Sequence, residues 1–572
     1  MFFLPFFSVT TWTLIVLALT LLLLYGIWPF NHFKKMGVRG PRPFPFMGTL
    51  PYFMKKGQHF TLECNKKYGD VWGQFDGLSP LLMVADPEML KVILVKECYS
   101  TFTNRRIFAK DIFGPLKDGI TMVKDDRWKR IRSTISPSFT SGRLKQVFPI
   151  VERYADRLVK TLDTEKPDQS VDVKKFVGPY SLDVMTSASF SIDTDTTVNP
   201  DAPLSVQLRN LLKFKIWPFF LIMALPFTQH LFRLTGISVL NKTSVDYFYN
   251  LVRRVQHDHK EDKSGHSDFL QLMIESEIQE SDIKDGVEPS KGMTDPEIVS
   301  QAFLFIFGGF DTTSTTLTYI LYNLALNPDA QQTLQQKIDV HFSKDSPVSY
   351  EDLMNLEYLD NVISESMRLL PTAPLIDRVC KKTFQINGLT IPEGTAVGVP
   401  LSNIHRDPRF WTSPELFKPE RFSKDHGEDI HPYAYMPFGL GPRNCVGMRF
   451  AVMVMKMVLV RLLRDHCVET CKDTVVRHTS FLTDADTWLI VETRSHHVSN
   501  CFNINLLLIW IKYLPYLDML HFFLSFFLSS FRYLWSLIRF FSPRSRSSLR
   551  LVEGNCNPPS TIKSAQQFYL LS

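Results

Sequence analysis

The stretch MPFGLGPRNCVGMRF, residues 436–450, decides how the rest of the sequence is interpreted. Cys445 lies among glycine, proline and arginine residues, and the apolar run behind it has the pattern of a helix. A helix N-terminus and nearby N–H donors stabilise a thiolate, which is the form of cysteine that binds metals. Glycines permit the close backbone approach that a flat ligand lying against the loop would need. We therefore interpret Cys445 as a metal ligand or a reactive thiol, with Arg443 placed to pair with an anionic group of the same ligand.

The composition bounds the class of protein. The chain has 572 residues, of which 45% are hydrophobic and 21% charged, as is ordinary for a globular protein. Its formal charge of +6 is small, and no zinc-finger or RNA-binding signature occurs, so we expect no nucleic-acid partner. The 46 phenylalanines indicate a large apolar core or contact with lipid and apolar ligands. Eight scattered cysteines favour a reducing compartment over a disulfide framework.

The N-terminus has the pattern of a membrane anchor. Residues 1–31 carry no charge, and the apolar run within them is about twenty residues long, enough to span a bilayer as a helix. Six lysines and arginines follow before the first acidic residue, Glu63, which predicts that the C-terminal side stays in the cytoplasm. A secretory signal would have a shorter core and a small-residue cleavage site. We predict an anchor over 1–31 and a cytosolic body.

The remainder divides by composition. Residues 32–51 are basic and proline-rich, which predicts a stiff hinge that orients the body against the membrane. Residues 52–476 have the pattern of one continuous α-rich domain with a few short strands. Within it, residues 211–227 are strongly apolar but interrupted by two prolines, so they are either core or the lip of a pocket that dips into lipid.

A long helix near residue 300 has an unusual middle. Thr294 and Glu297 form a capping-box pattern at its start, and the run that follows is apolar nearly all round, so we expect it to be buried. GGFDTT, residues 308–313, interrupts this run. Each glycine costs about 1 kcal/mol against alanine in a helix interior, and buried polar groups cost more unless they are paired. The segment therefore indicates function.

A second helix, over roughly 350–370, carries Glu365 and Arg368 three residues apart and so on one face. For an isolated E-x-x-R, the ordinary interpretation is a surface ion pair.

Taken together, these motifs resemble a known family. FGLGPRNCVG, residues 438–447, resembles the cysteine-loop signature F-x-x-G-x-R-x-C-x-G of the cytochrome P450 haem-thiolate monooxygenases, and every fixed position matches. WKRIR (128–132), GGFDTT, ESMR (365–368) and FKPERF (417–422) match further family motifs in the family's order. FTNRR, PSFTSGRLK, DFLQLMIESE and FGGFDTTST are most similar to the animal microsomal family 3 subfamily A. The resemblance covers residues 1 to about 475.

The resemblance implies a fold and a cofactor. The fold would be the mainly α (α+β) cytochrome P450 fold, with a single-pass N-terminal anchor and an atypical C-terminal extension. The cofactor would be haem b, with Cys445 as the axial thiolate to iron and Phe438 packed beside the sulfur. Arginine suits bidentate pairing with carboxylates, so the expected donors to the haem propionates are Arg105, Trp128, Arg132, Arg378 and Arg443.

The resemblance also implies roles for the polar segment of the long helix. Thr312 would hold a water in an oxygen-binding groove, Asp311 would help to relay protons, and Gly309 with its neighbour would leave room for oxygen and substrate. A buried structural network that holds the cysteine-loop region is implied for Glu365, Arg368 and Arg421.

Electrons must come from another protein. No G-x-G-x-x-G lies between a strand and a helix, so we find no nicotinamide or flavin site in this chain. The resemblance implies a separate NADPH–cytochrome P450 reductase, with cytochrome b5 as a second candidate donor. It also implies dioxygen and lipophilic substrates (steroids, xenobiotics), and location in the endoplasmic reticulum membrane.

Residues 477–572 match nothing in the family. Two readings stay open: an alternative or mispredicted C-terminus, or a segment that lies in the membrane interface. The predicted function is a membrane-bound monooxygenase. The alternative is a haem- or lipid-binding isoform with impaired turnover because of the divergent C-terminus. A zinc enzyme ranks third, since H-E-x-x-H is missing and Cys467 with Cys471 lacks a partnering pair.

Overall fold

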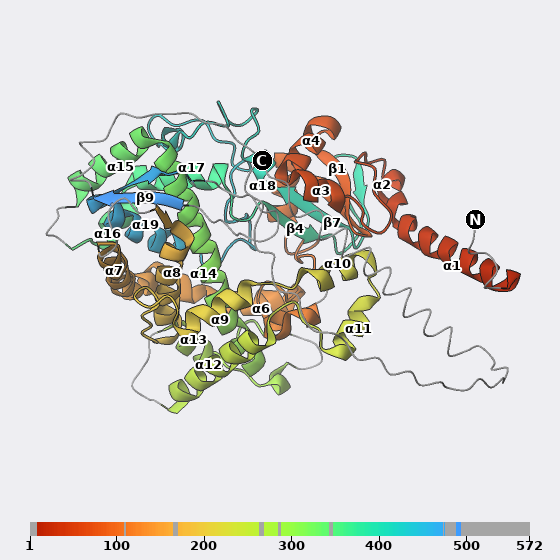
Figure 1. Cartoon of the computed structure of the whole chain (residues 1–572), viewed down its shortest axis with the longest axis horizontal. Helices are drawn as coiled ribbons and strands as arrows, with labels where there is room; N and C mark the ends of the chain where they lie inside the picture. Colours follow the sequence, from red (N-terminus) through yellow and green to blue (C-terminus); the bar gives the residue numbers. More distant parts are fainter. Residues whose placement is uncertain are drawn as a thin grey trace, which may run out of the picture. The chain divides into compact units, whose positions relative to one another are not determined.

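The computed structural model describes residues 8–107, 110–163, 170–261, 268–283, 288–342, 347–472, 474 and 488–493. Helices make up most of this part of the chain, as predicted (Figure 1). The predictions for residues 477–487 and 494–572 fall outside the described residues.

The helices of the first half are α1 (Val9–Ile27), η1 (Trp28–Asn31), α2 (His32–Lys35), α3 (Leu50–Lys56), α4 (Gln58–Tyr68), α5 (Pro87–Lys91), η2 (Val92–Lys96), η3 (Lys110–Asp118), α6 (Asp125–Ile135), η4 (Ser136–Phe139), α7 (Ser141–Asp163), α8 (Val173–Phe190), α9 (Pro203–Leu212), α10 (Ile216–Ala224), α11 (Thr228–Thr235), α12 (Lys242–Glu261) and α13 (Phe269–Glu275). Those of the second half are η5 (Glu280–Asp282), α14 (Asp295–Leu326), α15 (Pro328–His341), α16 (Tyr350–Asn355), α17 (Glu357–Leu369), α18 (Leu401–Ile404), η6 (Pro419–Phe422) and α19 (Met448–Asp465). The strands are β1 (Val71–Asp76), β2 (Ser79–Val84), β3 (Ser170–Asp172), β4 (Leu375–Val379), β5 (Phe384–Ile386), β6 (Leu389–Ile391), β7 (Ala396–Pro400), β8 (His466–Thr470) and β9 (Trp488–Thr493).

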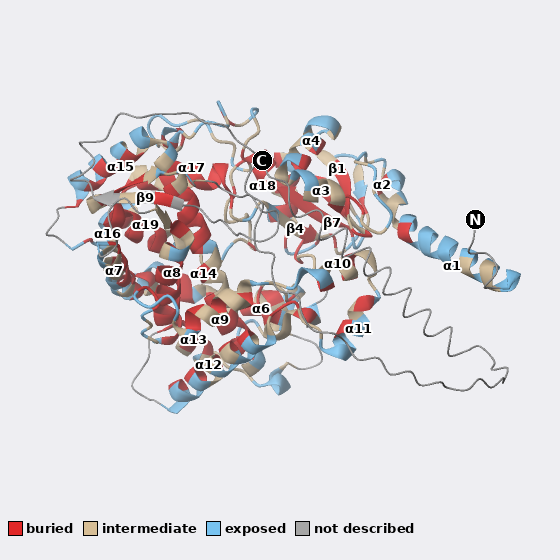
Figure 2. Cartoon of the chain, in the orientation of Figure 1, coloured by how far each residue is buried: buried red, intermediate tan, exposed pale blue. Residues whose placement is uncertain are grey.

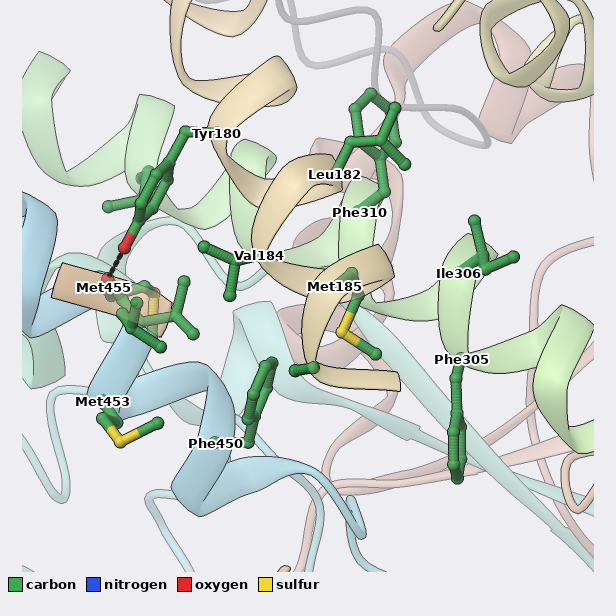
Figure 3. Packing of buried hydrophobic residues seen from close by; sticks show 14 of the residues in the cluster. Tyr180, Leu182, Val184, Met185, Phe305, Ile306, Phe310, Phe450, Met453 and Met455 are labelled. Atoms are coloured by element: carbon green, nitrogen blue, oxygen red, sulfur yellow. Dashed lines mark hydrogen bonds between the residues drawn. The ribbon is translucent and has the colours of Figure 1, made fainter. Parts of the chain in front are cut away.

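Helix α14 forms the centre of the larger core. The predicted capping box is confirmed, because the Thr294 N–H donates to Glu297 Oε2 at 2.8 Å and the Thr294 side chain accepts from the third helical N–H. Most of α14 is buried, and α8 and α19 pack in the same hydrophobic cluster (Figure 3). The Tyr180 hydroxyl on α8 donates to the Val454 carbonyl on α19 at 2.9 Å, which links these two helices through a buried polar group.

The strands form separate small sheets. The largest has the order β1-β2-β7-β4, in which only β2 and β7 pair in parallel, and a second hydrophobic cluster surrounds it. The isolated bridge between Asn104 and Val379 joins the loop before η3 to the edge strand β4. This sheet therefore fixes the position of β4, which reaches the functional cavity described below.

Strand β9 lies beyond residue 476, where the predicted catalytic domain ends. It pairs antiparallel with β8 along Trp488–Thr493, and its other edge pairs with β3, in the order β3-β9-β8. The body of the protein therefore continues past residue 476 to at least residue 493. The run WLIVET is typical of a strand, but β3 lies more than three hundred residues earlier, so no local signal indicates the pairing.

The N-terminal helix fits a membrane anchor. The helical segment Val9–Lys35 has 27 residues, and an 18-residue window within it has a mean hydropathy of 2.2 and is mostly unburied (Figure 2). At its end, the Phe46 N–H donates to the Gly26 carbonyl at 3.1 Å. A Cβ on Gly26 would lie 2.6 Å from the Phe46 ring, so glycine lets the proline-rich segment pack directly on the helix.

The interrupted apolar stretch 211–227 has features both of a core segment and of an exposed apolar lip. Helix α10 buries Ile222 and Met223, which are 3% and 2% exposed, against the body. Trp217 and Phe227 are 42% and 61% exposed, so the same stretch also presents an apolar outer face.

Glu365, Arg368 and Arg421 contact one another in the interior. Glu365 Oε2 accepts from Arg368 Nε at 2.7 Å, and Glu365 Oε1 accepts from Arg421 Nε at 3.0 Å. Their side chains are at most 1% exposed, so these charges are compensated by each other rather than by water. The E-x-x-R pair on α17 is therefore not a surface ion pair.

His405 connects this network to the cysteine loop. Its carbonyl accepts from Arg368 at 2.9 Å, and its Nε2 accepts from the Met436 N–H at 3.1 Å. Burial, with the nearby Arg368 charge, lowers the pKa of His405 to about 3. The ring is thus neutral at physiological pH and able to accept a hydrogen bond at the start of the loop.

We expect Glu365→Ala to destabilise the protein by about 3–5 kcal/mol, because it leaves two guanidinium groups buried without their carboxylate. The matched control is Glu63→Ala, which removes an exposed ion pair with Lys56. The Glu63 and Lys56 side chains are 56% and 42% exposed, so this loss should cost at most about 1 kcal/mol. Urea unfolding of both variants, followed by circular dichroism, measures the difference. Equal midpoints would show that the network contributes no more than a surface pair.

Candidate functional site

Cys445 lies on a tight loop just before α19. Its N–H donates to the Phe438 carbonyl at 2.9 Å, which closes the loop on itself. Gly441 has φ +73°, and a Cβ there would lie 1.9 Å from the Leu94 carbonyl oxygen, so only glycine fits. Because α19 begins at Met448, the Cys445 side chain lies near the positive end of a helix dipole. The predicted loop and helix N-terminus are both present.

A cavity of about 490 Å³ borders this loop. It lies where α14, the segment before α6, β4 and the loop meet. The residues predicted to bind a cofactor that line it are Arg105, Trp128, Arg132, Gly309, Arg378, Phe438, Arg443 and Cys445, together with Thr312. Asp311, Glu365, Arg368 and Arg421 are not among its lining residues. The structure therefore groups nine of the predicted residues around one space and keeps the ion network away from it.

Three arginines give this cavity an uncompensated positive charge. Burial and the charges of the other two arginines lower the pKa of Arg443 to about 9. Burial and the Arg105 charge lower the pKa of Arg378 to about 10. Asp377 offsets only part of this effect. An anionic ligand in the cavity would relieve the repulsion.

Hydrogen-bond donors of the same arginines are free to bind such a ligand. Arg443 donates to the Thr103 carbonyl at 2.6 Å and the Val123 carbonyl at 2.9 Å, which hold the side chain in place. The Nε atoms of Arg378 and Arg443 are nevertheless buried with no partner in the described part of the chain. Buried donors without partners are costly, so they indicate a ligand with acceptor oxygens. The residues therefore fit a cofactor with carboxylate groups.

Arg132 and Trp128 support the loop and the arginine cluster. Arg132 donates to the Asn444 carbonyl and to Asn444 Oδ1, both at 2.8 Å, so it clamps the residue before Cys445. The Arg443 guanidinium carbon lies 4.7 Å from the centre of the Trp128 ring, close enough for a cation–π contact. The helix α6 motif therefore contacts the cysteine loop directly as well as the cavity.

The Cys445 side chain lines the cavity and is exposed there. Burial raises the pKa of its thiol, while the Gly447 N–H and the charges of Arg132 and Arg105 lower it. Coordination to a metal ion deprotonates a thiol outright, so a bound metal would override the effect of burial.

Asp311 and Thr312 point in different directions from α14. The Thr312 hydroxyl is exposed to the cavity and donates to the Gly308 carbonyl at 2.6 Å. Asp311 Oδ1 instead lies 2.9 Å from Lys174 Nζ at the start of α8. Sequence analysis missed Lys174, because this lysine lies 137 residues from Asp311 and no local pattern singles it out.

Gly308 and Gly309 also differ in their surroundings. A Cβ on Gly308 would meet nothing within 4 Å, whereas a Cβ on Gly309 would lie 2.5 Å from Met185 Cγ on α8. The Gly309 carbonyl also accepts from the Ser181 hydroxyl on α8 at 3.1 Å. Gly308 therefore leaves space, whereas the main requirement at Gly309 is the close packing of α8 on α14 (Figure 3).

This geometry defines a class of site: a cavity in a helical body, bordered by an arginine cluster that fits an anionic cofactor and by one cysteine among its lining residues. The family model described as Cytochrome P450 matches residues 38–486. Cytochrome P450 3A27 of Oncorhynchus mykiss is 46% identical over 480 residues, which are 83% of this chain and 92% of that protein. Cytochrome P450 3A9 of Rattus norvegicus is 45% identical over 476 residues, or 82% and 93% of the two chains.

The chain therefore belongs to the cytochrome P450 family, and its relatives include subfamily 3A proteins of fishes and mammals. Membership makes it a haem-thiolate monooxygenase, an oxidoreductase whose cofactor is haem iron with a thiolate ligand. The matched range ends at residue 486, which is past residue 476 and two residues before β9 begins.

The two glycines of α14 should respond differently to alanine. Gly308→Ala should change the stability by less than about 1 kcal/mol, because the added methyl group meets no protein atom within 4 Å. Gly309→Ala should destabilise the protein by about 1–3 kcal/mol, because the new methyl group overlaps Met185. Thermal unfolding of the holoenzyme measures both changes. The double variant Gly309→Ala/Met185→Ala should recover part of the loss, and failure to do so would contradict the packing explanation.

Proposed function

We propose that this chain is a membrane-bound monooxygenase in which Cys445 is the axial thiolate and lipophilic substrates, such as steroids and xenobiotics, are oxidised with NADPH-derived electrons. The observation that carries the proposal is the single cavity that Cys445, Thr312 and the arginine cluster share.

The arginines would hold the carboxylates of the cofactor. The free Nε–H groups of Arg378 and Arg443 are donors, and Arg105 completes the cluster of cations on the same side. Trp128 stacks on Arg443, and Arg132 keeps the loop before Cys445 in place. When bound, haem iron supplies dioxygen activation, to which an axial thiolate contributes electron density.

The rest of the cavity wall is apolar and suits lipophilic substrates. Leu304, Phe305, Ile120, Ala373 and Leu375 line it together with the polar groups already described. Apolar walls with a few oriented polar groups are typical of small-molecule sites, and they exclude bulk water from the reacting centre. The wall supports a broad lipophilic class rather than one substrate.

Thr312 and Asp311 would take part in proton transfer from two sides of α14. The Thr312 hydroxyl gives its hydrogen to the Gly308 carbonyl, so its oxygen is left as an acceptor that can hold a water in the cavity. Asp311 is held by Lys174 on the side of α8, where it could pass protons toward the cavity. The pair is thus assigned a relay role, with Lys174 positioning the carboxylate.

Electrons would come from NADPH–cytochrome P450 reductase, with cytochrome b5 as a second donor, at the endoplasmic reticulum membrane. Residues 1–31 would be the anchor, of which Val9–Ile27 form the apolar helix α1, and residues 32–51 would be the hinge. The contact between Phe46 and Gly26 supports this arrangement. The alternative, a binding protein without turnover, rested on a divergent C-terminus. Because β9 completes the sheet with β3 and β8, the core argues for the active enzyme.

Cys445→Ala should abolish the strongly red-shifted Soret band of the reduced carbon-monoxide complex and all substrate oxidation, because it removes the thiolate ligand. The full chain expressed in membranes is the material for this difference spectrum. Cys64→Ala, at a buried cysteine outside the cavity, is the control and should keep the band. A red-shifted band that survives in Cys445→Ala would remove this cysteine from the ligand role.

Thr312→Ala should retain haem and its spectrum but release peroxide, because the water held by the hydroxyl is lost. The product formed per NADPH consumed should fall severalfold with a steroid substrate. Thr318→Ala is the matched control, since the Thr318 hydroxyl makes the same kind of bond to the carbonyl four residues earlier, at 2.8 Å, but does not line the cavity. Equal coupling in the two variants would contradict the relay.

A further inference from the structure

A second cavity, separate from the one at Cys445, lies between η3, the start of α6 and α11. Its volume is about 490 Å³. The basic side chains that line it are Lys110, Lys117, Lys124, Arg127, His230 and Arg233, and none of the lining residues whose side chains the structure describes is acidic. The side chain of Asp111 lies outside that description. These residues come from two parts of the chain about a hundred residues apart, so the fold, and not a local run, brings the cations together.

Most of this charge is not neutralised by the protein. Arg127 is paired, since it lies 2.9 Å from Asp118 and 2.7 Å from Glu297. By contrast, the three lysines and Arg233 make no side-chain hydrogen bond or ion pair within the described ranges. Asp125, which follows Lys124, is instead bonded to Lys381 at 2.7 Å. Single free lysines are ordinary at a surface, but four cations around one concavity repel one another and favour a multivalent anion.

We propose that this cavity binds a phosphate group, presented by an anionic phospholipid headgroup or as free phosphate. Lysines bind phosphate as point charges and arginine binds it bidentately, so the chemistry of the wall matches. Helix α11 favours the lipid source. His230 and Arg233 lie three residues apart on its cavity face, and beside them Leu231 and Leu234 are 54% and 82% exposed. Such a helix pairs a basic face with an apolar stripe, as interfacial helices do.

Occupation of this cavity should change substrate binding at the haem site. Ile120 lines the Cys445 cavity, while Met122 and Val123, two and three residues later, line the basic cavity. The Val123 carbonyl accepts from Arg443 at 2.9 Å, so one short segment is bonded to the cofactor-side arginine and faces the phosphate site. Phosphate binding should therefore alter substrate affinity, and substrate should alter phosphate affinity by the same factor.

The first test is a lysine footprint of the full-length holoenzyme. The holoenzyme is placed in phosphatidylcholine nanodiscs with or without phosphatidic acid. Separately, it is placed in neutral detergent with inorganic phosphate or with chloride at equal ionic strength. Acylation rates of Lys110, Lys117 and Lys124 are followed by mass spectrometry. With phosphate at about twice its Kd, mass action leaves roughly one third of the sites free, so these rates should fall about threefold. Lys337 and Lys382, which are exposed and outside the cavity, are the reference and should not change.

The outcomes separate the two sources. Protection by phosphatidic acid alone supports the phospholipid headgroup, and protection by inorganic phosphate as well supports a site open to free phosphate. Equal rates in every condition, equal protection by chloride, or an equal fall at Lys337 and Lys382 would overturn the proposal.

Charge-matched variants provide the second test. Lys117→Gln/Arg233→Gln should lose the protection at the remaining lysines of the cavity. Lys337→Gln/Lys382→Gln removes the same amount of charge from exposed positions outside the cavity and should keep the protection of the cavity lysines. Both variants are checked by the reduced carbon-monoxide spectrum, which reports an intact cysteine site independently of phosphate. Retained protection in the first variant, or loss in both, would contradict the proposal.

Discussion

The central constraint of the structure is a positive charge at the Cys445 cavity that the described part of the protein compensates only in part. Arg105, Arg378 and Arg443 meet at one cavity wall, and burial together with mutual repulsion lowers the pKa of two of them. Such charges are costly in a protein interior unless a counter-charge reaches them. The elements that carry them come from distant parts of the chain. The arrangement is therefore understandable only if an anionic ligand belongs to the structure.

The buried cluster of Glu365, Arg368 and Arg421 differs from the cavity arginines, because its charges are paired within the protein. Around Glu365, both arginines have their carboxylate, and Arg368 also donates to backbone carbonyls, so nothing is left for a ligand. His405 extends this satisfied network to Met436, where the cysteine loop begins. Satisfied buried charges thus hold the loop from behind, and unsatisfied ones face the cavity. The distinction between a structural and a binding role rests on where the donors go, and not on burial alone.

How much the sequence predicts depends on how local the interaction is. The cysteine loop, the capping box at Thr294 and the pairing of Glu365 with Arg368 involve neighbours on the chain, and the structure contains all three. The contact of Met185 with α14 and the pairing of β9 with β3 join distant segments, and the sequence pattern does not indicate them. The basic cavity belongs to the same group, because its lysines and α11 look like ordinary surface residues in sequence.

The interior of α14 illustrates why adjacent motif residues need separate explanations. Successive residues of an α-helix are about 100° apart around its axis, since 3.6 residues complete a turn. Thr312 therefore opens into the cavity, while Asp311 turns toward Lys174 on α8. In the same way Gly308 borders open space and Gly309 borders Met185. One six-residue motif thus serves two surfaces of the helix, a wall of the cavity and a packing face. The helix separates the partly exposed ion pair of Asp311 and Lys174 from the cavity that would use its proton, so any transfer between them must pass around or across α14.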